Sequence, residues 1–236
     1  MKLVVTRPEA DAPELAAALR LRGHDAVIAP VLSIRPRRDV QVPKRVYQVI
    51  AVTSANGPRA LSHKARRGLN LAIPVLAVGA QSAAAAENLG FTNVLAAGGD
   101  VHGLVAHIKA RFSPRKGPVL YLSGAETSGD LEGQLKAAGF DVDRVITYDA
   151  VAQKLDRWRE AIADSDGVLL YSPRSAKLWQ NELARLGLAR ALLRLRHYCL
   201  SVQVAEALPP NTHISIAAEP TEAALLGLLD LAGKAE

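Results

Sequence analysis

Two stretches that lie far apart in the chain follow the same pattern. Leu3 to Pro30 reads as an apolar strand, a polar turn, a helix with leucines at i and i+4, a glycine, an aspartate and a second strand. Val119 to Val145 repeats that order, and Gly139 follows its helix as Gly23 follows the first. A repeat of this length means that one supersecondary unit occurs twice.

Two further pairs extend the repeat. Val49–Leu61 resembles Gly167–Trp179, and Pro74–Gly90 more loosely resembles His197–Leu208. Three strand–helix modules therefore occur twice, and such alternation favours parallel sheets with helices on both faces. The chain is predicted to be an α/β protein of two similar three-layer domains, which its 236 residues can form.

Two stretches interrupt this rhythm and are predicted to cross between domains. They are Ser33–Arg38 and Val145–Val151, and each follows the second strand of a repeated unit. The proline and the arginines of the first favour a linker over a core strand. The first helix is expected from about Asp11 to Arg22, with Asp11 as its cap.

Composition excludes some classes of protein and leaves others open. Hydrophobic residues make up 49% and the net charge is +6, which indicates a packed core and a preference for anionic partners. Compositional bias or solvated surface helices also explain such a charge. No aromatic residues interleave with the basic ones, so nucleic acid is not the expected partner. No apolar run is long enough to span a membrane, and a cytoplasmic location is expected.

Several catalytic and metal-binding motifs are absent. Gly124 to Gly129 has the glycine spacing of a phosphate loop, but Asp130 stands where lysine is needed. Neither a dinucleotide fingerprint nor a serine-hydrolase elbow occurs. His102 and His107 lack the spacing of metal ligands on one helix face. The single cysteine, Cys199, reads as a small buried apolar residue.

Small polar residues recur where predicted strands end. Thr6, Ser54, Ser123 and Ser172 each end a strand and precede a helix. Ligands bind at this edge of open α/β sheets, and helix N-termini there suit carboxylates. Capping of the helix is the commoner explanation for any single one of these residues. Their recurrence in both halves favours a two-sided, anion-binding cleft.

Three larger side chains are candidates for the same cleft. Arg7 and Arg174 follow strand ends, where a guanidinium can bind a carboxylate or simply lie on the surface. Tyr148 lies in the second crossing, either as a half-buried anchor or as a phenol that donates a proton.

The order of five blocks resembles the uroporphyrinogen-III synthase family over nearly the whole chain. These blocks are VVTRPEA, VTSANGPRAL, VLAVGAQSAAAAENLG, GFDVDRVITYDAV and LLYSPRSAKLW. The resemblance implies two flavodoxin-like domains joined by a two-stranded linker. Domain one would combine residues 1–34 with 152–236, domain two would be 39–146, and the linkers would lie near 35–38 and 147–151.

The resemblance also implies an activity. Enzymes of the family close hydroxymethylbilane, an acidic linear tetrapyrrole, into uroporphyrinogen III, with inversion of the terminal pyrrole ring and release of water. No metal or organic cofactor is implied, and a monomer is expected. Tyr148 aligns with the family's conserved tyrosine of the second linker, and we expect it to support the reaction as a proton donor or at the leaving group. The substrate-binding residues predicted for this chain are Thr6, Arg7, Ser54, Asn56, Ser82, Ser123, Gly124, Thr127, Ser172, Arg174 and Gln203.

The chain departs from the family pattern at two places. Val202, Gln203 and Val204 stand in a turn where the family usually has two threonines, and Gln81–Ser82 stands where a threonine is usual. These changes keep a second hypothesis open: a non-catalytic, two-lobed protein that binds or senses an acidic small molecule.

Overall fold

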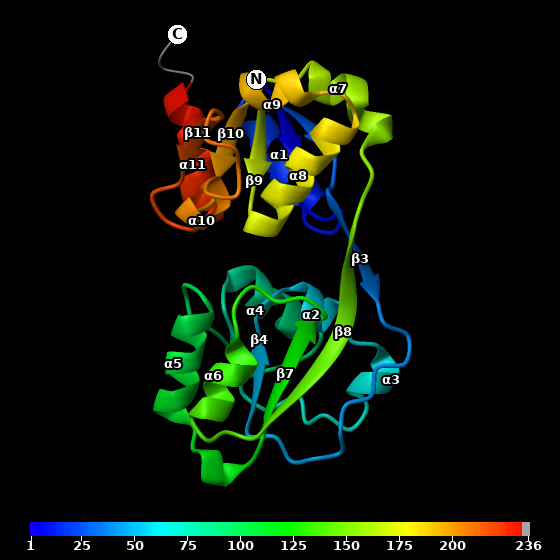
Figure 1. Cartoon of the computed structure of the whole chain (residues 1–236). Coiled ribbons are helices and arrows are strands. Elements are labelled where there is room, and N and C mark those ends of the chain that lie inside the picture. Colours follow the sequence, from blue (N-terminus) through cyan, green and yellow to red (C-terminus); the bar gives the residue numbers. More distant parts are fainter. Residues whose placement is uncertain (233–236) are drawn as a thin grey trace. The chain divides into compact units, whose positions relative to one another are not determined.

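The computed structural model describes residues 1–232. It divides into two compact units, which we call domain one (Met1–Ser33 with Val151–Glu236) and domain two (Ile34–Ala150). Each domain holds a single sheet between helices (Figure 1).

Domain one has a five-stranded sheet in the order β11-β10-β9-β1-β2, and all neighbouring strands are parallel. Its strands are β1 (Lys2–Val5), β2 (Asp25–Ile28), β9 (Gly167–Leu170), β10 (Arg196–Cys199) and β11 (His213–Ile216). One face packs against α1 (Ala12–Leu21) and α11 (Glu222–Ala232). The other packs against η2 (Asp156–Trp158), α7 (Arg159–Ala163), α8 (Pro173–Arg185), α9 (Ala189–Arg194) and α10 (Val202–Ala205).

Domain two has a six-stranded sheet in the order β3-β8-β7-β4-β5-β6. Its strands are β3 (Leu32–Pro36), β4 (Val49–Val52), β5 (Val75–Ala77), β6 (Val94–Ala96), β7 (Val119–Gly124) and β8 (Val142–Ala152). α2 (Asn56–Arg59), α3 (His63–Arg66) and α4 (Ala80–Asn88) cover one face. α5 (Val101–Arg111) and α6 (Leu131–Ala137) cover the other, and η1 (Pro114–Lys116) precedes β7.

The two sheets have the same spatial order once the repeat is taken into account. Counted as β1, β2, β9, β10, β11, the strands of domain one lie in the order 2-1-3-4-5, which is the flavodoxin order. Counted as β7, β8, β4, β5, β6, the strands of domain two lie in that order too, with β3 added at the edge. The predicted fold class, two similar domains with parallel sheets, is confirmed.

The segment Ser33–Arg38, predicted to be a linker rather than a core strand, begins within a strand at the edge of the sheet. Leu32–Pro36 forms β3, an edge strand beside β8. The amide of Arg37 donates to the carbonyl of Thr147 (2.8 Å) and the amide of Gln153 to that of Val31 (3.0 Å), so these two segments run antiparallel. The edge position accommodates Pro36, because an edge strand leaves one row of amides unpaired.

The helix predicted near the N-terminus is present, but its cap differs from the prediction. α1 begins after Asp11 and ends before Gly23, whose φ of 75° suits glycine. The Asp11 carboxylate makes no capping hydrogen bond. It lies 3.4 Å from Nη2 of Arg7 instead, because an ion pair with a guanidinium competes for the same oxygens.

Candidate functional site

The carboxyl ends of β7 and β4 form the switch point of the domain-two sheet. These two strands are neighbours, and the chain leaves them toward opposite faces, as at ligand sites of other doubly wound sheets. The hydroxyl groups of Thr53 and Tyr121 lie 3.0 Å apart there, just beyond β4 and on β7. Burial raises the pKa of Tyr121, so its phenol stays protonated and forms a neutral hydrogen bond.

Tyr148 lies on β8 directly beside the end of β7. It is only 7% exposed, and its ring lies so close to Gly124 that a Cβ atom added there would overlap it. The amide of Ala125 donates to the Tyr148 carbonyl (3.0 Å), which holds β8 against the segment that follows β7. Of the two readings left open by the sequence, the anchor on a strand agrees with this position, although the side chain is buried rather than half-buried. The role of the phenol in a substrate site stays a prediction.

Replacing Gly124 with alanine is expected to lower the free energy of unfolding by about 1–3 kcal/mol, as overpacking does. A Cβ atom at this position would lie 2.7 Å from Cζ of Tyr148, so the ring has to move. Urea denaturation measures the change. Gly79→Ala is the matched control, because a Cβ there meets no atom within 4 Å. Equal stability of both variants would contradict the contact.

The remaining predicted residues of domain two are buried or form hydrogen bonds within that domain. Ser54 Oγ accepts from the Asn56 amide (3.3 Å), and Thr127 donates to the Gly129 carbonyl (3.1 Å). Ser123 is 1% exposed and accepts a hydrogen bond, while Ser82 is buried in α4. Of the predicted set, Ser123 and Gly124 end one strand and Ser54 follows its neighbour, so the structure brings these three to one edge.

The predicted residues of domain one also lie at the carboxyl edge of its sheet. Thr6 is buried and donates to the Leu169 carbonyl (2.7 Å), which ties the end of β1 to β9. Ser172 caps α8 in a capping box with Ser175. Arg174 follows in the first turn of that helix, and Gln203 is exposed on α10. Helix capping, the alternative kept open from sequence, is the observed role of Ser172.

Arg7 is bound within domain one. Its Nη1 lies 2.5 Å from Glu222 at the start of α11, its Nη2 lies 3.4 Å from Asp11, and its guanidinium lies 4.6 Å from the centroid of the Tyr171 ring. Burial and the nearby Glu222 carboxylate raise the pKa of Tyr171. A substrate carboxylate at Arg7 would have to replace Glu222. Substrate binding by Arg7 therefore stays a prediction, and it requires that Glu222 be displaced.

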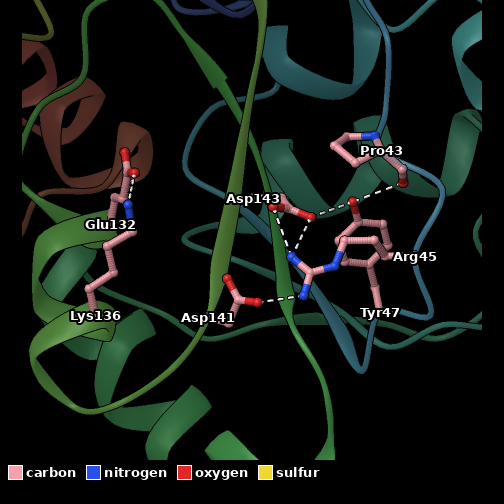
Figure 2. Close-up of polar contacts among 7 residues, drawn as sticks. All are labelled: Pro43, Arg45, Tyr47, Glu132, Lys136, Asp141 and Asp143. Atoms are coloured by element: carbon pink, nitrogen blue, oxygen red, sulfur yellow. Dashed lines mark hydrogen bonds and ion pairs between the residues drawn. The ribbon is translucent and has the colours of Figure 1, made fainter.

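Some polar clusters lie away from these edges. At the amino end of the domain-two sheet, Arg45 pairs with Asp141 and Asp143, and Tyr47 donates to Asp143 (2.8 Å) and to the Pro43 carbonyl (3.0 Å), as Figure 2 shows. This network fastens the segment before β4 to the start of β8.

The core of domain one holds two titratable groups, and the expectation that Cys199 is a small buried residue is confirmed. His197 and Cys199 are fully buried on β10, and Trp179 of α8 donates to Nε2 of His197 (3.3 Å). Burial lowers the pKa of His197 to about 4 and raises that of the Cys199 thiol to about 12. Both are therefore neutral core groups near pH 7. Within residues 1–232 no group of three or more potential metal ligands gathers.

Sequence reasoning missed Arg144, Tyr171 and Glu222. Arg144 binds Ser123 and the backbone after β7, and the other two surround Arg7. In the repeat, Tyr171 is equivalent to Thr53, since each is the first residue after a central strand, so that signal was present. Nothing in the local sequence distinguishes Arg144 or Glu222 from surface charges.

These observations define a class: a two-domain, doubly wound α/β protein with hydroxyl and amide groups at the carboxyl end of each sheet. Among the described residues, no helix has both the length and the apolar character needed to cross a bilayer. A family model described as uroporphyrinogen-III synthase HemD matches residues 13–227. The chain belongs to the uroporphyrinogen-III synthase family.

Solved structures agree with this assignment at the level of fold. The uroporphyrinogen-III synthetase of Helicobacter pylori is 16% identical, with a TM-score of 0.66 over 98% of this chain and 99% of that one. A mutant synthase of Thermus thermophilus is also 16% identical, with a TM-score of 0.58 over 100% of both chains. No curated protein matches.

Family membership supports a function in haem biosynthesis. It implies a lyase-type enzyme of tetrapyrrole synthesis, with hydroxymethylbilane as its substrate.

Proposed function

We propose that this chain closes hydroxymethylbilane to uroporphyrinogen III with release of water, as a cyclising carbon–oxygen lyase. The match to the family over residues 13–227 carries the proposal. The polar carboxyl ends of the two sheets support it, because they offer backbone amides and hydroxyl groups to the acetate and propionate arms of a polyanion.

The main contribution of the protein to this reaction is to position the substrate. A pyrrole nitrogen pushes electrons to expel the hydroxyl group, which leaves as water after gaining a proton. The resulting azafulvene is attacked by the terminal ring to give a spiro intermediate, which fragments and closes with that ring inverted. Holding the flexible chain so that this closure outruns the spontaneous one is a task for fixed dipoles and charges.

Tyr148 is the proposed proton donor to the departing hydroxyl group, in a supporting role. Its ring is fixed over Gly124 at the carboxyl end of β7. A neutral phenol can donate a proton or a hydrogen bond and still leave much of the reaction to the reactive substrate.

The proposal includes a monomer in the cytoplasm that needs no metal or organic cofactor. Sedimentation measures the oligomeric state, and cell fractionation measures the location. Metal analysis, with an activity assay after exhaustive chelation, tests the independence from cofactors. A loss of activity that metal restores would contradict the last part.

One assay tests the proposal against its alternative. The protein is supplied with freshly generated hydroxymethylbilane, and the oxidised porphyrin isomers are resolved. Spontaneous closure gives isomer I, so a dominant isomer III is expected. Unchanged isomer I, with measurable binding of the substrate, supports instead the non-catalytic binder that exposed Gln203 and buried Val204 keep open.

Replacing Tyr148 with phenylalanine is expected to lower the rate about tenfold, the loss of one hydrogen bond of about 1.4 kcal/mol, and to leave isomer III as the product. Tyr47→Phe is the control, because the Tyr47 phenol binds Asp143 at the amino end of the sheet. That variant should lose stability and keep the rate. A folded Tyr148→Phe protein with no activity would contradict the supporting role.

A further inference from the structure

Arg144 of β8 makes three hydrogen bonds to three consecutive residues at the end of β7. Its Nε donates to Ser123 Oγ (2.9 Å), and its Nη2 donates to the carbonyls of Gly124 (2.9 Å) and Ala125 (2.8 Å). One planar guanidinium therefore fixes the last two residues of the strand and the first residue beyond it.

The charge of this guanidinium is only partly neutralised. Its three acceptors are neutral oxygens, and the carboxylate of Glu132 lies 3.8 Å from Nη1. Glu132 is shared, because it also binds Lys136 of the same helix at 2.6 Å (Figure 2). The Arg144 side chain is 25% exposed. Positive charge therefore remains at the sheet's carboxyl edge, which suits a carboxylate-rich ligand.

The backbone that Arg144 holds is also the support of Tyr148. The Tyr148 ring packs on Gly124, and the amide of Ala125 donates to the Tyr148 carbonyl. Release of the Gly124 and Ala125 carbonyls would therefore loosen both the surface under the ring and the turn that begins at Ala125.

We propose that Arg144 is a positioning residue of the substrate site: it orders the segment from Ser123 through the Ala125–Asp130 turn, and with it the Tyr148 ring, for binding of the tetrapyrrole. This inference rests on the proposed function. It adds to that function a residue that acts through its neighbours without touching the reacting atoms.

The variants Arg144→Gln and Arg144→Lys test the proposal. Both are expected to raise the KM for hydroxymethylbilane about tenfold and to increase the share of isomer I, since slower capture leaves more substrate to spontaneous closure. Lysine should fail like glutamine, because its ammonium cannot reproduce a planar fork that serves three acceptors. Full activity of Arg144→Lys would show that charge alone suffices and would overturn the proposal.

Arg45→Gln is the matched control. Arg45 is also an arginine that fastens β8, but it pairs with Asp141 and Asp143 at the other end of the sheet. It is expected to lower stability and to leave KM and the isomer ratio unchanged. The same change in KM in both variants would mean that Arg144 acts only through general stability, and would overturn the positioning role.

A readout without substrate separates this inference from the proposed function. Amide hydrogen exchange of Ala125 and the following turn is expected to accelerate about tenfold in Arg144→Gln and to stay unchanged in Arg45→Gln. Unchanged exchange in Arg144→Gln overturns the inference. Wild-type protein that gives only isomer I overturns the proposed function, and the exchange data still decide whether Arg144 orders the turn.

Discussion

Replacing Trp179 with alanine is expected to lower the free energy of unfolding of domain one by about 3–5 kcal/mol. The indole of Trp179 is fully buried between α8 and the sheet, and it is among the largest fully buried side chains of the described residues. Its removal leaves a cavity and also deprives Nε2 of His197 of its donor. Urea denaturation followed by far-UV circular dichroism measures the loss.

Two variants separate the causes of that effect. Trp179→Phe keeps most of the buried ring and loses the N–H donor, so it should cost less than the alanine variant. Leu193→Ala removes an exposed side chain (48%) of α9 and should change stability by at most about 0.5 kcal/mol. A Trp179→Ala protein within about 1 kcal/mol of wild type would show that the domain-one core does not depend on the indole.

The fold class could be predicted because the same strand–helix pattern occurs twice in the chain. Apolar strands with small polar turns and leucine-bearing helices impose the same three-layer unit wherever they occur. The order of the units in each sheet could not be predicted from the repeat itself. The unit of β7, α6 and β8 comes last in domain two, whereas the equivalent unit of β1, α1 and β2 comes first in domain one. Two strands, β3 and β8, therefore run across the division between the domains.

Side-chain pairing could not be predicted in the same way. Arg7 is bound by Glu222, which lies 215 positions away in the chain, and Arg144 binds residues about twenty positions before it. Such partners are set by tertiary packing, and no local period or motif records them. For the same reason Asp11 occupies the predicted cap position and yet pairs with Arg7.

In the candidate site, the positions of residues could be predicted, but their side-chain partners could not. The repeat predicts which residues follow the central strands, because strand ends are fixed by topology. It does not predict which hydroxyl groups remain available, since a serine at a strand end can cap a helix, as Ser172 does, or bind a neighbouring arginine, as Ser123 does. Both uses stabilise the edge at which the ligand is proposed to bind.

Acid is expected to destabilise domain one through His197 by about 3 kcal/mol between pH 7 and pH 4. Burial lowers the pKa of His197 to about 4 in the folded state, whereas an unfolded histidine has a pKa of about 6.5. Between these values the unfolded state binds more protons, so the free energy of unfolding falls as pH falls. The stabilisation is fully present above pH 6.5 and is lost on approach to pH 4. Urea denaturation at a series of pH values measures the slope.

The variant His197→Gln isolates this contribution. Glutamine can still accept a hydrogen bond from Trp179 but does not titrate, so the slope between pH 6.5 and 4 should flatten even if the variant is less stable at pH 7. His63→Gln, which alters an exposed histidine of α3, should keep the wild-type slope. The hydrogen bond from Arg37 lowers the pKa of Asp149. A carboxylate of this kind loses its contribution to stability mainly below its unfolded pKa of about 3.9, which is a lower pH range than that of His197. An unchanged slope in His197→Gln would show that the imidazole is not the group that senses acid.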